Sequence, residues 1–322
     1  MTQTELRRFD RTQTTMFFDP GAQPLAELRD GERVVVETAD SICGIAKREA
    51  PKGFHVDEIV ERLGGACPVT GPFYVEGAHA GDALTVELHR VDPFPAEGVA
   101  WTGIFRGFGA LQHEPYSLAE ELEPELRLVS YANGIAHLPF ATGSVEVPLH
   151  PFIGTIGVAP RYEKRLSFSQ SPEYLGDVDV PQITAGGVLV LPVNVEGALL
   201  ALGDAHAAQG DGEINGAALE IEADVELTVR VASREGAEFV KLPQINNEDA
   251  IGSIAGYQGV SLADCTRAGY IDLVERLVRF HRFQKREAYE LLGQVGRVQV
   301  GNMIDPFYSA MVSIDRRYLE RS

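Results

Sequence analysis

The segment Gly203–Glu213 gathers acids, a histidine and glycines that could hold a metal ion. Asp204 and His206 lie two residues apart, so on an extended strand their side chains point to the same side. A carboxylate and an imidazole on one side suit a divalent, zinc-like ion. Glu213 follows a Gly-Asp-Gly bend at 210–212, which could return its carboxylate to the same point. The segment is therefore a candidate metal site.

The same segment also fits a polar loop. Asp204 and Asp211 are of a residue type that forms Asx turns. An acid and a histidine two residues apart also occur by chance in many chains. From this segment alone, a turn and a metal site both remain open.

Further acids extend the candidate site. Asp177 and Asp179, in "LGDVDV", are again two residues apart and share a side if extended. They precede the apolar run that leads to Asp204, so neighbouring strands would bring four polar side chains together. Asp40 follows the strand-like run "RVVVET". A single acid in such a place also fits a solvent-facing residue or a cap.

Short β-rich runs bounded by Gly, Pro or acids predict the elements that must position these groups. The clearest is 218–231, in which apolar and polar residues alternate, as in a long half-buried strand that could bend midway. Glu220 falls on its polar face and is expected to be solvated. Further strands are predicted at 33–38, 83–89, 188–195, 298–304 and 309–315.

Helix signals are concentrated late in the chain. One helix is predicted over 261–281, with Ser261 as N-cap and an apolar stripe that includes Ile271 and Val278. A second is predicted over 285–293, ending at Gly293.

These elements predict a mainly β body and a smaller α+β part. The body spans 1–235 and carries the candidate site, and 236–322 holds two helices and then strands. The connection is expected within 234–252.

Composition excludes several classes of partner. The chain has 322 residues, 44% of them hydrophobic, and a formal net charge of −19. That charge disfavours nucleic acid and anionic membrane surfaces. The three cysteines, Cys43, Cys67 and Cys265, form no C-x-x-C pair and are expected to be structural, which fits a reducing cytoplasm. No secretory signal or transmembrane run is visible.

Five blocks along the chain resemble the acetamidase/formamidase family. The longest are "PVNVEGALLALGDAHAAQGDGEINGAALE" (192–220) and "CPVTGPFYVEGAHAGDALTVEL" (67–88). The others are "ETADSICG" (37–44), "HPFIGTIGVAP" (150–160) and "REAYELLGQVGRVQVGNMIDP" (286–306). Nearly the whole chain is covered, and in the same order.

The resemblance implies a hydrolase that splits short linear amides, of the acetamide and formamide class, into a carboxylate and ammonia. It implies a β-sandwich-like fold with a smaller α+β part. It also implies a divalent metal, zinc or else calcium, held by Asp40, Asp179, Asp204 and His206, with Glu213 as general base. Asp177 stands where the family usually has Asn, which changes the metal environment or the substrate polarity.

Amide hydrolysis agrees with the residue types present. A metal can activate water and polarise the carbonyl, and a nearby carboxylate can carry the proton to nitrogen. No G-x-S-x-G elbow supports a covalent route. His150 and Gln209 are expected to contact substrate, although a loop cap and simple packing are equally open for them.

Other functions stay open at this stage. A non-catalytic protein that binds a metal or small ligand is the main alternative, and a hydrolase of another C–N bond is the third. A homodimer is the expected assembly.

Overall fold

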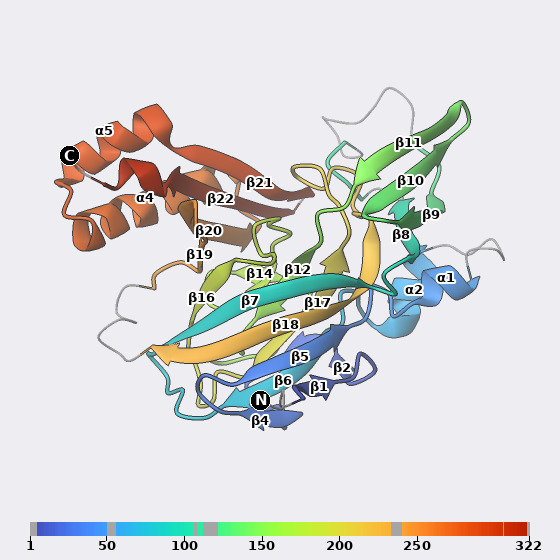
Figure 1. Ribbon diagram of the computed structural model, residues 1–322, viewed down its shortest axis with the longest axis horizontal. Helices are drawn as coiled ribbons and strands as arrows, with labels where there is room; N and C mark the ends of the chain where they lie inside the picture. Colours follow the sequence, from blue (N-terminus) through green and yellow to red (C-terminus); the bar gives the residue numbers. More distant parts are fainter. Residues whose placement is uncertain are drawn as a thin grey trace.

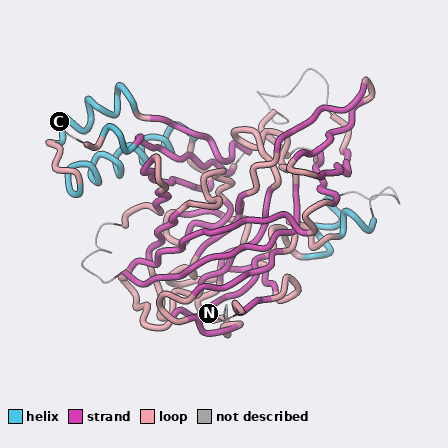
Figure 2. The backbone as a smooth tube through the Cα atoms, in the orientation of Figure 1, coloured by secondary structure: helices cyan, strands magenta, loops and turns pink. Residues whose placement is uncertain are grey.

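The chain folds into two stacked β-sheets with helices at two separate edges (Figure 1). The computed structural model describes residues 5–49, 56–105, 108–111, 122–232, 240–304 and 306–320. Strands dominate the path of the backbone (Figure 2). The predicted class, mainly β and sandwich-like with a smaller α+β part, is confirmed.

The first sheet runs from the N-terminal strand to the C-terminal part of the chain. In spatial order its strands are β1 (Arg7–Phe9), β5 (Arg33–Thr38), β18 (Glu220–Ala232), β7 (Ala83–Phe94), β16 (Val188–Pro192), β19 (Gln244–Asn246), β20 (Ala250–Gln258), β22 (Phe307–Asp315) and β21 (Arg297–Ile304).

The second sheet lies against the first. Its central run is β4 (Ala26–Leu28), β6 (Val69–Val75), β17 (Leu200–His206), β12 (Phe152–Gly157), β15 (Leu175–Asp177) and β14 (Gln170–Ser171). A side branch holds β8 (Gly98–Ile104), β9 (Glu125–Ala132), β10 (Ile135–Phe140) and β11 (Gly143–Pro148). The short strands are β2 (Thr14–Thr15), which pairs with β6, and β3 (Phe17–Phe18), which pairs with β13 (Arg165–Leu166).

Strand β18 belongs to both sheets. Its first residues, Glu220 and Ile221, pair with β17, and Glu220 also pairs with Trp101 of β8. From Glu222 onward the strand pairs with β7, and from Ala223 with β5. The long alternating segment is therefore one strand, as predicted, and it passes from the second sheet to the first.

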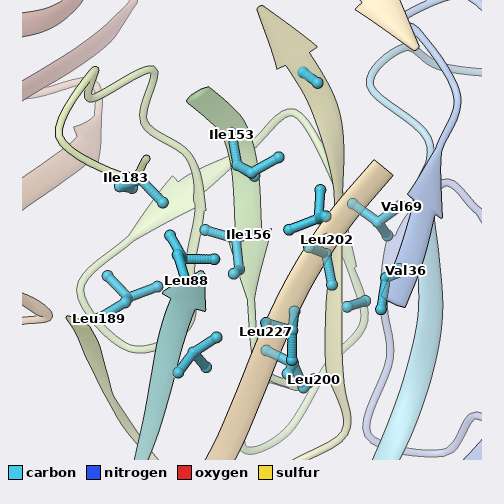
Figure 3. Close-up of a cluster of buried hydrophobic side chains, with 14 of the residues drawn as sticks. Val36, Val69, Leu88, Ile153, Ile156, Ile183, Leu189, Leu200, Leu202 and Leu227 are labelled. Atoms are coloured by element: carbon cyan, nitrogen blue, oxygen red, sulfur yellow. The ribbon is translucent and has the colours of Figure 1, made fainter. Parts of the chain in front are cut away.

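Aliphatic side chains from the two sheets meet in one core. Figure 3 shows Val36 and Leu227 of the first sheet facing Leu200 and Leu202 of the second. Ile156 of β12 lies in the same cluster, and all five side chains are fully buried. Burial of this kind stabilises the sandwich by about 1.5–3 kcal/mol for each large side chain.

The apolar run before the candidate site is two strands, not the single one predicted over 188–195 and onward. It begins with β16 in the first sheet, turns, and continues as β17 in the second sheet. Gly197 makes the turn possible because its φ is +72° and a Cβ there would lie 2.1 Å from the Tyr74 ring.

The C-terminal part differs from the prediction in its order. Strands β19 and β20 precede the two helices, α4 (Leu262–Phe280) and α5 (Lys285–Val295). Ser261 caps α4 as predicted, but α5 continues past Gly293 to Val295. Ile271 and Val278 are exposed and do not form the buried stripe. The boundary expected at 235/236 falls in 233–239, outside the described residues, and stays a prediction.

Two further helices lie beside β8 and β9 in the β body (Figure 1). They are α1 (Ile45–Glu49) and α2 (Val56–Leu63), and the sequence patterns did not indicate them. A 3-10 turn, η2 (Arg316–Tyr318), follows β22. Among the described helices, none has the length and apolar character needed to cross a bilayer.

Candidate metal centre

The end of β17 brings Asp204 and His206 together as predicted. Asp204 Oδ1 lies 3.5 Å from His206 Nε2, and both side chains are buried. Asp204 has a φ of +54°, so the strand is locally left-handed at this residue. Such a conformation is uncommon for a residue with a side chain and is typical of functional sites.

Asp179 reaches the same point from the far side of β12. Its Oδ1 lies 3.9 Å from His206 Nε2. The two acids converge over Gly154 of β12, where a Cβ would lie 2.7 Å from Asp179 Oδ1 and 2.9 Å from Asp204 Oδ2. The missing side chain at this glycine therefore makes room for two carboxylates.

Glu220 is a site residue that the sequence patterns placed in solvent. It is buried, and its Oε1 lies 3.6 Å from His206 Nε2. It stands directly opposite His206 on β17 and Trp101 on β8, because the start of β18 lies in the second sheet. Ser41 Oγ donates a hydrogen bond to its other oxygen at 2.6 Å.

Glu213 returns to the cluster through the predicted glycine bend. Gly212 has a φ of +84°, and its backbone is held by hydrogen bonds to Val300 and Met303 of β21. Glu213 Oε1 accepts a hydrogen bond of 2.8 Å from the amide of Ala218, which also donates to Glu220 Oε1 at 3.0 Å. One amide therefore sets these two carboxylates side by side.

We call Asp179, Asp204, His206, Glu213 and Glu220 the acid–histidine cluster. It sets four buried carboxyl groups against one imidazole. Burial raises the pKa of Asp179 to about 6 and that of Glu220 to about 8. Burial and the charge of Asp179 raise the pKa of Glu213 well above its usual range.

The pKa of Asp204 is lowered, unlike that of the other acids, and the pKa of His206 is raised. Burial opposes the charge of Asp204, but the neighbouring imidazolium holds its pKa at about 2. Burial also opposes the charge of His206, but Glu220 and Asp204 raise its pKa well above the ordinary value. When no metal ion is bound, the His206 imidazolium supplies the positive charge within the cluster.

Gln209 supports His206, and its predicted contact with substrate stays a prediction. Its Nε2 donates to the carbonyls of Asp179 and Gly301, each at 3.0 Å. With both amide hydrogens used, Oε1 is fixed toward His206 Nδ1 at 2.8 Å and must accept the Nδ1 proton. Neutral His206 then presents the lone pair of Nε2 to the cluster, which is the arrangement of a metal ligand.

Other polar residues hold the acids in place. Asn302 Nδ2 donates to Asp179 Oδ2 at 2.9 Å, and Thr155 Oγ lies 3.1 Å from Asp204 Oδ2 and contacts Asp177. Cys67, Asp177 and Asp204 form a further group of potential ligands. Asn302 and Thr155 lie on strands and have no special spacing in the sequence, so no signal singled them out.

Two predicted site residues lie apart from the cluster. Oδ1 of the buried Asp40 carboxylate accepts hydrogen bonds from the amides of Ile42, at 3.2 Å, and Gly44, at 2.6 Å, whereas Oδ2 has no hydrogen-bond partner among the described residues. The carboxylate caps this turn, and it is not among the described groups whose ligand atoms converge. His150 is exposed and lines a cavity of about 860 Å³, which we call the second cavity. Glu213 forms part of the wall of this cavity.

The geometry of the cluster fits a divalent cation. Ligands bound to one zinc ion at about 2.0–2.2 Å lie roughly 3.3–3.6 Å apart in a tetrahedral site, and His206 Nε2 lies 3.5, 3.6 and 3.9 Å from three carboxylate oxygens. Within the described residues, buried Asp204 Oδ1 accepts no hydrogen bond. A buried oxygen without a partner is costly, and a cation would satisfy it.

A chamber of about 440 Å³ opens from the cluster. The cluster forms one end, and apolar side chains form the rest of the wall, among them Ile42, Val60, Trp101, Phe105, Phe108 and Phe307. The site therefore has a charged end and an apolar end.

Comparisons with known proteins agree with the resemblance seen in the sequence. A crystal structure of an acetamidase from Bacillus halodurans has a TM-score of 0.83 and 28% identity, over 97% of this chain and 98% of that one. An acetamidase from Yersinia enterocolitica has a TM-score of 0.84 and 28% identity, over 97% and 91%.

The curated relatives match over shorter stretches. An acetamidase of Mycolicibacterium smegmatis is 29% identical over 46% of this chain and 48% of its own length. A putative formamidase of Schizosaccharomyces pombe is 26% identical over 60% of this chain and 57% of its own length. The chain therefore spans about half the length of the curated relatives it matches. The model of the Acetamidase/Formamidase family matches residues 7–174 and 167–295. The chain belongs to the acetamidase/formamidase family.

Proposed function

We propose that this chain is a metal-dependent hydrolase that splits the C–N bond of a linear amide into a carboxylate and ammonia. The family and the acetamidase neighbours support amide hydrolysis. Metal dependence rests on one observation above all, the buried Asp204 Oδ1 that lacks a hydrogen bond 3.5 Å from His206 Nε2.

The ligands we propose are Asp179, Asp204, His206 and Glu220. This set takes Glu220 in place of Asp40 of the expected ligands, because Glu220 Oε1 lies 3.6 Å from His206 Nε2 and Asp40 is not among the described groups whose ligand atoms converge. A nitrogen donor among carboxylates favours zinc, and the excess of oxygen donors keeps calcium as the alternative. A bound divalent cation lowers the pKa of water and polarises a carbonyl oxygen.

Glu213 is the proposed general base. Its Oε1 is engaged by the Ala218 amide, so Oε2 is the oxygen that takes a proton from water and returns it to the leaving nitrogen. Its raised pKa suits this role, because burial and the neighbouring negative charge make the carboxylate a stronger base than a free glutamate. Its burial keeps bulk water from competing for that proton.

Metal analysis of the purified protein by mass spectrometry, paired with His206→Ala, tests the proposal. We expect bound metal in the wild type, loss of metal in the variant, and loss of ammonia release from formamide and acetamide. A folded, metal-free protein that still releases ammonia contradicts the metal mechanism.

A panel of amides, ureas and formyl compounds separates this proposal from its alternatives. Turnover of a urea alone would assign the chain to another C–N bond. Ligand binding without turnover of any compound would favour a binding protein, a function that the acid at Asp177 motivates.

A cytoplasmic location and a homodimer are also proposals. The three free cysteines suit a reducing compartment. Light scattering coupled to size exclusion measures the assembly directly.

A further inference from the structure

The chamber beside the acid–histidine cluster is larger than the smallest amides require. If each non-hydrogen atom takes about the 30 Å³ that water takes in the liquid, the four such atoms of acetamide need roughly 120 Å³. The chamber has about 440 Å³. Acetamide would leave most of it to water against apolar walls, which is unfavourable.

The walls form a continuous aromatic row. The rings of Trp101 and Phe105 are 6.5 Å apart and edge to face, and those of Phe105 and Phe108 are 5.8 Å apart in the same geometry. Such edges and faces bind an aliphatic chain or a ring well. Phe168 and Phe307, 6.1 Å apart, line the chamber as a second aromatic pair.

Trp101 lies at the junction between the charged end and the apolar end of the chamber. It is directly opposite Glu220 in the sheet, and its side chain is only 2% exposed. Among the described residues, its indole N–H has no hydrogen-bond partner. A buried donor without a partner is costly, and a ligand oxygen at this junction would satisfy it.

We propose that the chamber receives a primary amide with an apolar acyl group of about five to eight carbons. The carboxamide lies at the acid–histidine cluster, the acyl group lies along the aromatic row, and the Trp101 indole N–H donates to the amide oxygen. This inference rests on the proposed function and names its substrate class. The reaction is the same: water adds to the acyl carbon, the C–N bond breaks, and the nitrogen leaves as ammonia.

Kinetics with primary amides of increasing acyl size test the inference. Each buried methylene is worth roughly fourfold in affinity. We therefore expect kcat/KM to rise at least tenfold from acetamide to hexanamide or phenylacetamide. A kcat/KM that is highest for formamide or acetamide would overturn the inference while leaving amide hydrolysis intact, and so would a preference for N-butylformamide over pentanamide.

Fluorescence gives a readout that does not depend on turnover. Trp101 is the single tryptophan of the chain, so protein emission excited at its absorption edge reports on this wall. Phenylacetamide should shift or quench the emission saturably, at a concentration at least tenfold lower than acetamide. If no amide is hydrolysed but this saturable change remains, the proposed function fails and the binding inference stands. No saturable change overturns the inference.

Two matched substitutions locate the effect. Val60 of α2 lines the chamber and is half-buried, whereas Val145 of β11 is 51% exposed and lines neither the chamber nor the second cavity. Val60→Phe should lower the ratio of kcat/KM for phenylacetamide to that for acetamide at least tenfold. Val145→Phe should leave the ratio unchanged. Equal ratios in both variants would overturn the placement of the acyl group.

Discussion

Two buried polar clusters of this chain differ in charge balance. The acid–histidine cluster has four buried carboxyl groups around one imidazole, and among the described residues Asp204 Oδ1 accepts no hydrogen bond. The C-terminal cluster, made of Asp272, Arg276, Ser253 and Asn246, has one acid and one base. Arg276 donates to the Gly252 carbonyl at 2.6 Å, to Ser253 Oγ at 3.0 Å and to Asn246 at 2.7 Å.

The difference separates a structural cluster from a functional one. In the C-terminal cluster, Ser253 also donates to Asp272, so each charge has partners inside the protein. Such a cluster joins α4 to β20 and β19. The acid–histidine cluster has more acids than bases and an acceptor without a hydrogen bond, which a divalent cation would balance.

The largest effect is expected from the acid–histidine cluster. Glu213→Gln keeps the shape of the side chain but removes the proposed base, so kcat for the best amide should fall about 10²–10⁴-fold. Bound metal, measured by mass spectrometry, should stay close to the wild-type amount. Asp211→Asn is the control, because Asp211 lies in the same bend but is exposed. A Glu213→Gln variant with more than a third of wild-type kcat would exclude Glu213 as the base.

A substitution in the C-terminal cluster should lower the stability of the protein rather than its activity. Arg276→Met leaves Asp272 buried without its cation, so the free energy of unfolding should fall by about 3–5 kcal/mol in urea titrations. The activity of the folded fraction should remain. Arg267→Met is the control, because Arg267 forms an exposed ion pair with Asp264 and such pairs contribute about 0–1 kcal/mol. A loss below 1 kcal/mol in Arg276→Met would show that the cluster is not structural.

Local patterns predicted the parts of the site that one segment contains. Asp204 and His206 were found from their spacing, and Glu213 from the glycine bend before it. These features depend on the conformation of a few consecutive residues. The class of the fold was predictable for the same reason, because alternation in 218–231 depends on one strand.

Parts of the site that depend on pairing between distant strands were missed. The alternation of apolar and polar residues placed Glu220 on a solvated face. The start of β18, however, pairs with β17 and β8, whereas the rest of the strand pairs with β7. The convergence of Asp179 and Asp204 was expected from neighbouring strands, whereas the structure places β12 between β15 and β17, and Gly154 of β12 makes room for both acids. Asp40 stays a prediction: the nearby amides of Ile42 and Gly44 bond its Oδ1, and its carboxylate lies outside the described groups whose ligand atoms converge.

The smallest effect is the pH dependence of stability that the acid–histidine cluster introduces. Without metal, Glu220 has a folded-state pKa of about 8 against an ordinary value of 4.5, so the folded protein binds a proton that the unfolded chain releases between these values. Its contribution to stability is therefore full below about pH 4.5 and is lost as pH rises through about 8. Asp179 acts the same way up to about pH 6, whereas Asp204, with a pKa of about 2, loses its contribution only in strong acid.

The melting temperature of the chelator-treated protein should therefore fall between pH 5 and pH 8. Glu220→Gln removes one of the titrating groups, so calorimetry should show a shallower fall for this variant. Added zinc or calcium should also flatten the slope, because the cation takes the place of the protons. Arg276 keeps its charge across this range, with a pKa of about 10, so it adds nothing to the slope. An identical slope in Glu220→Gln would mean that the excess charge of the acid–histidine cluster is not what destabilises the metal-free protein.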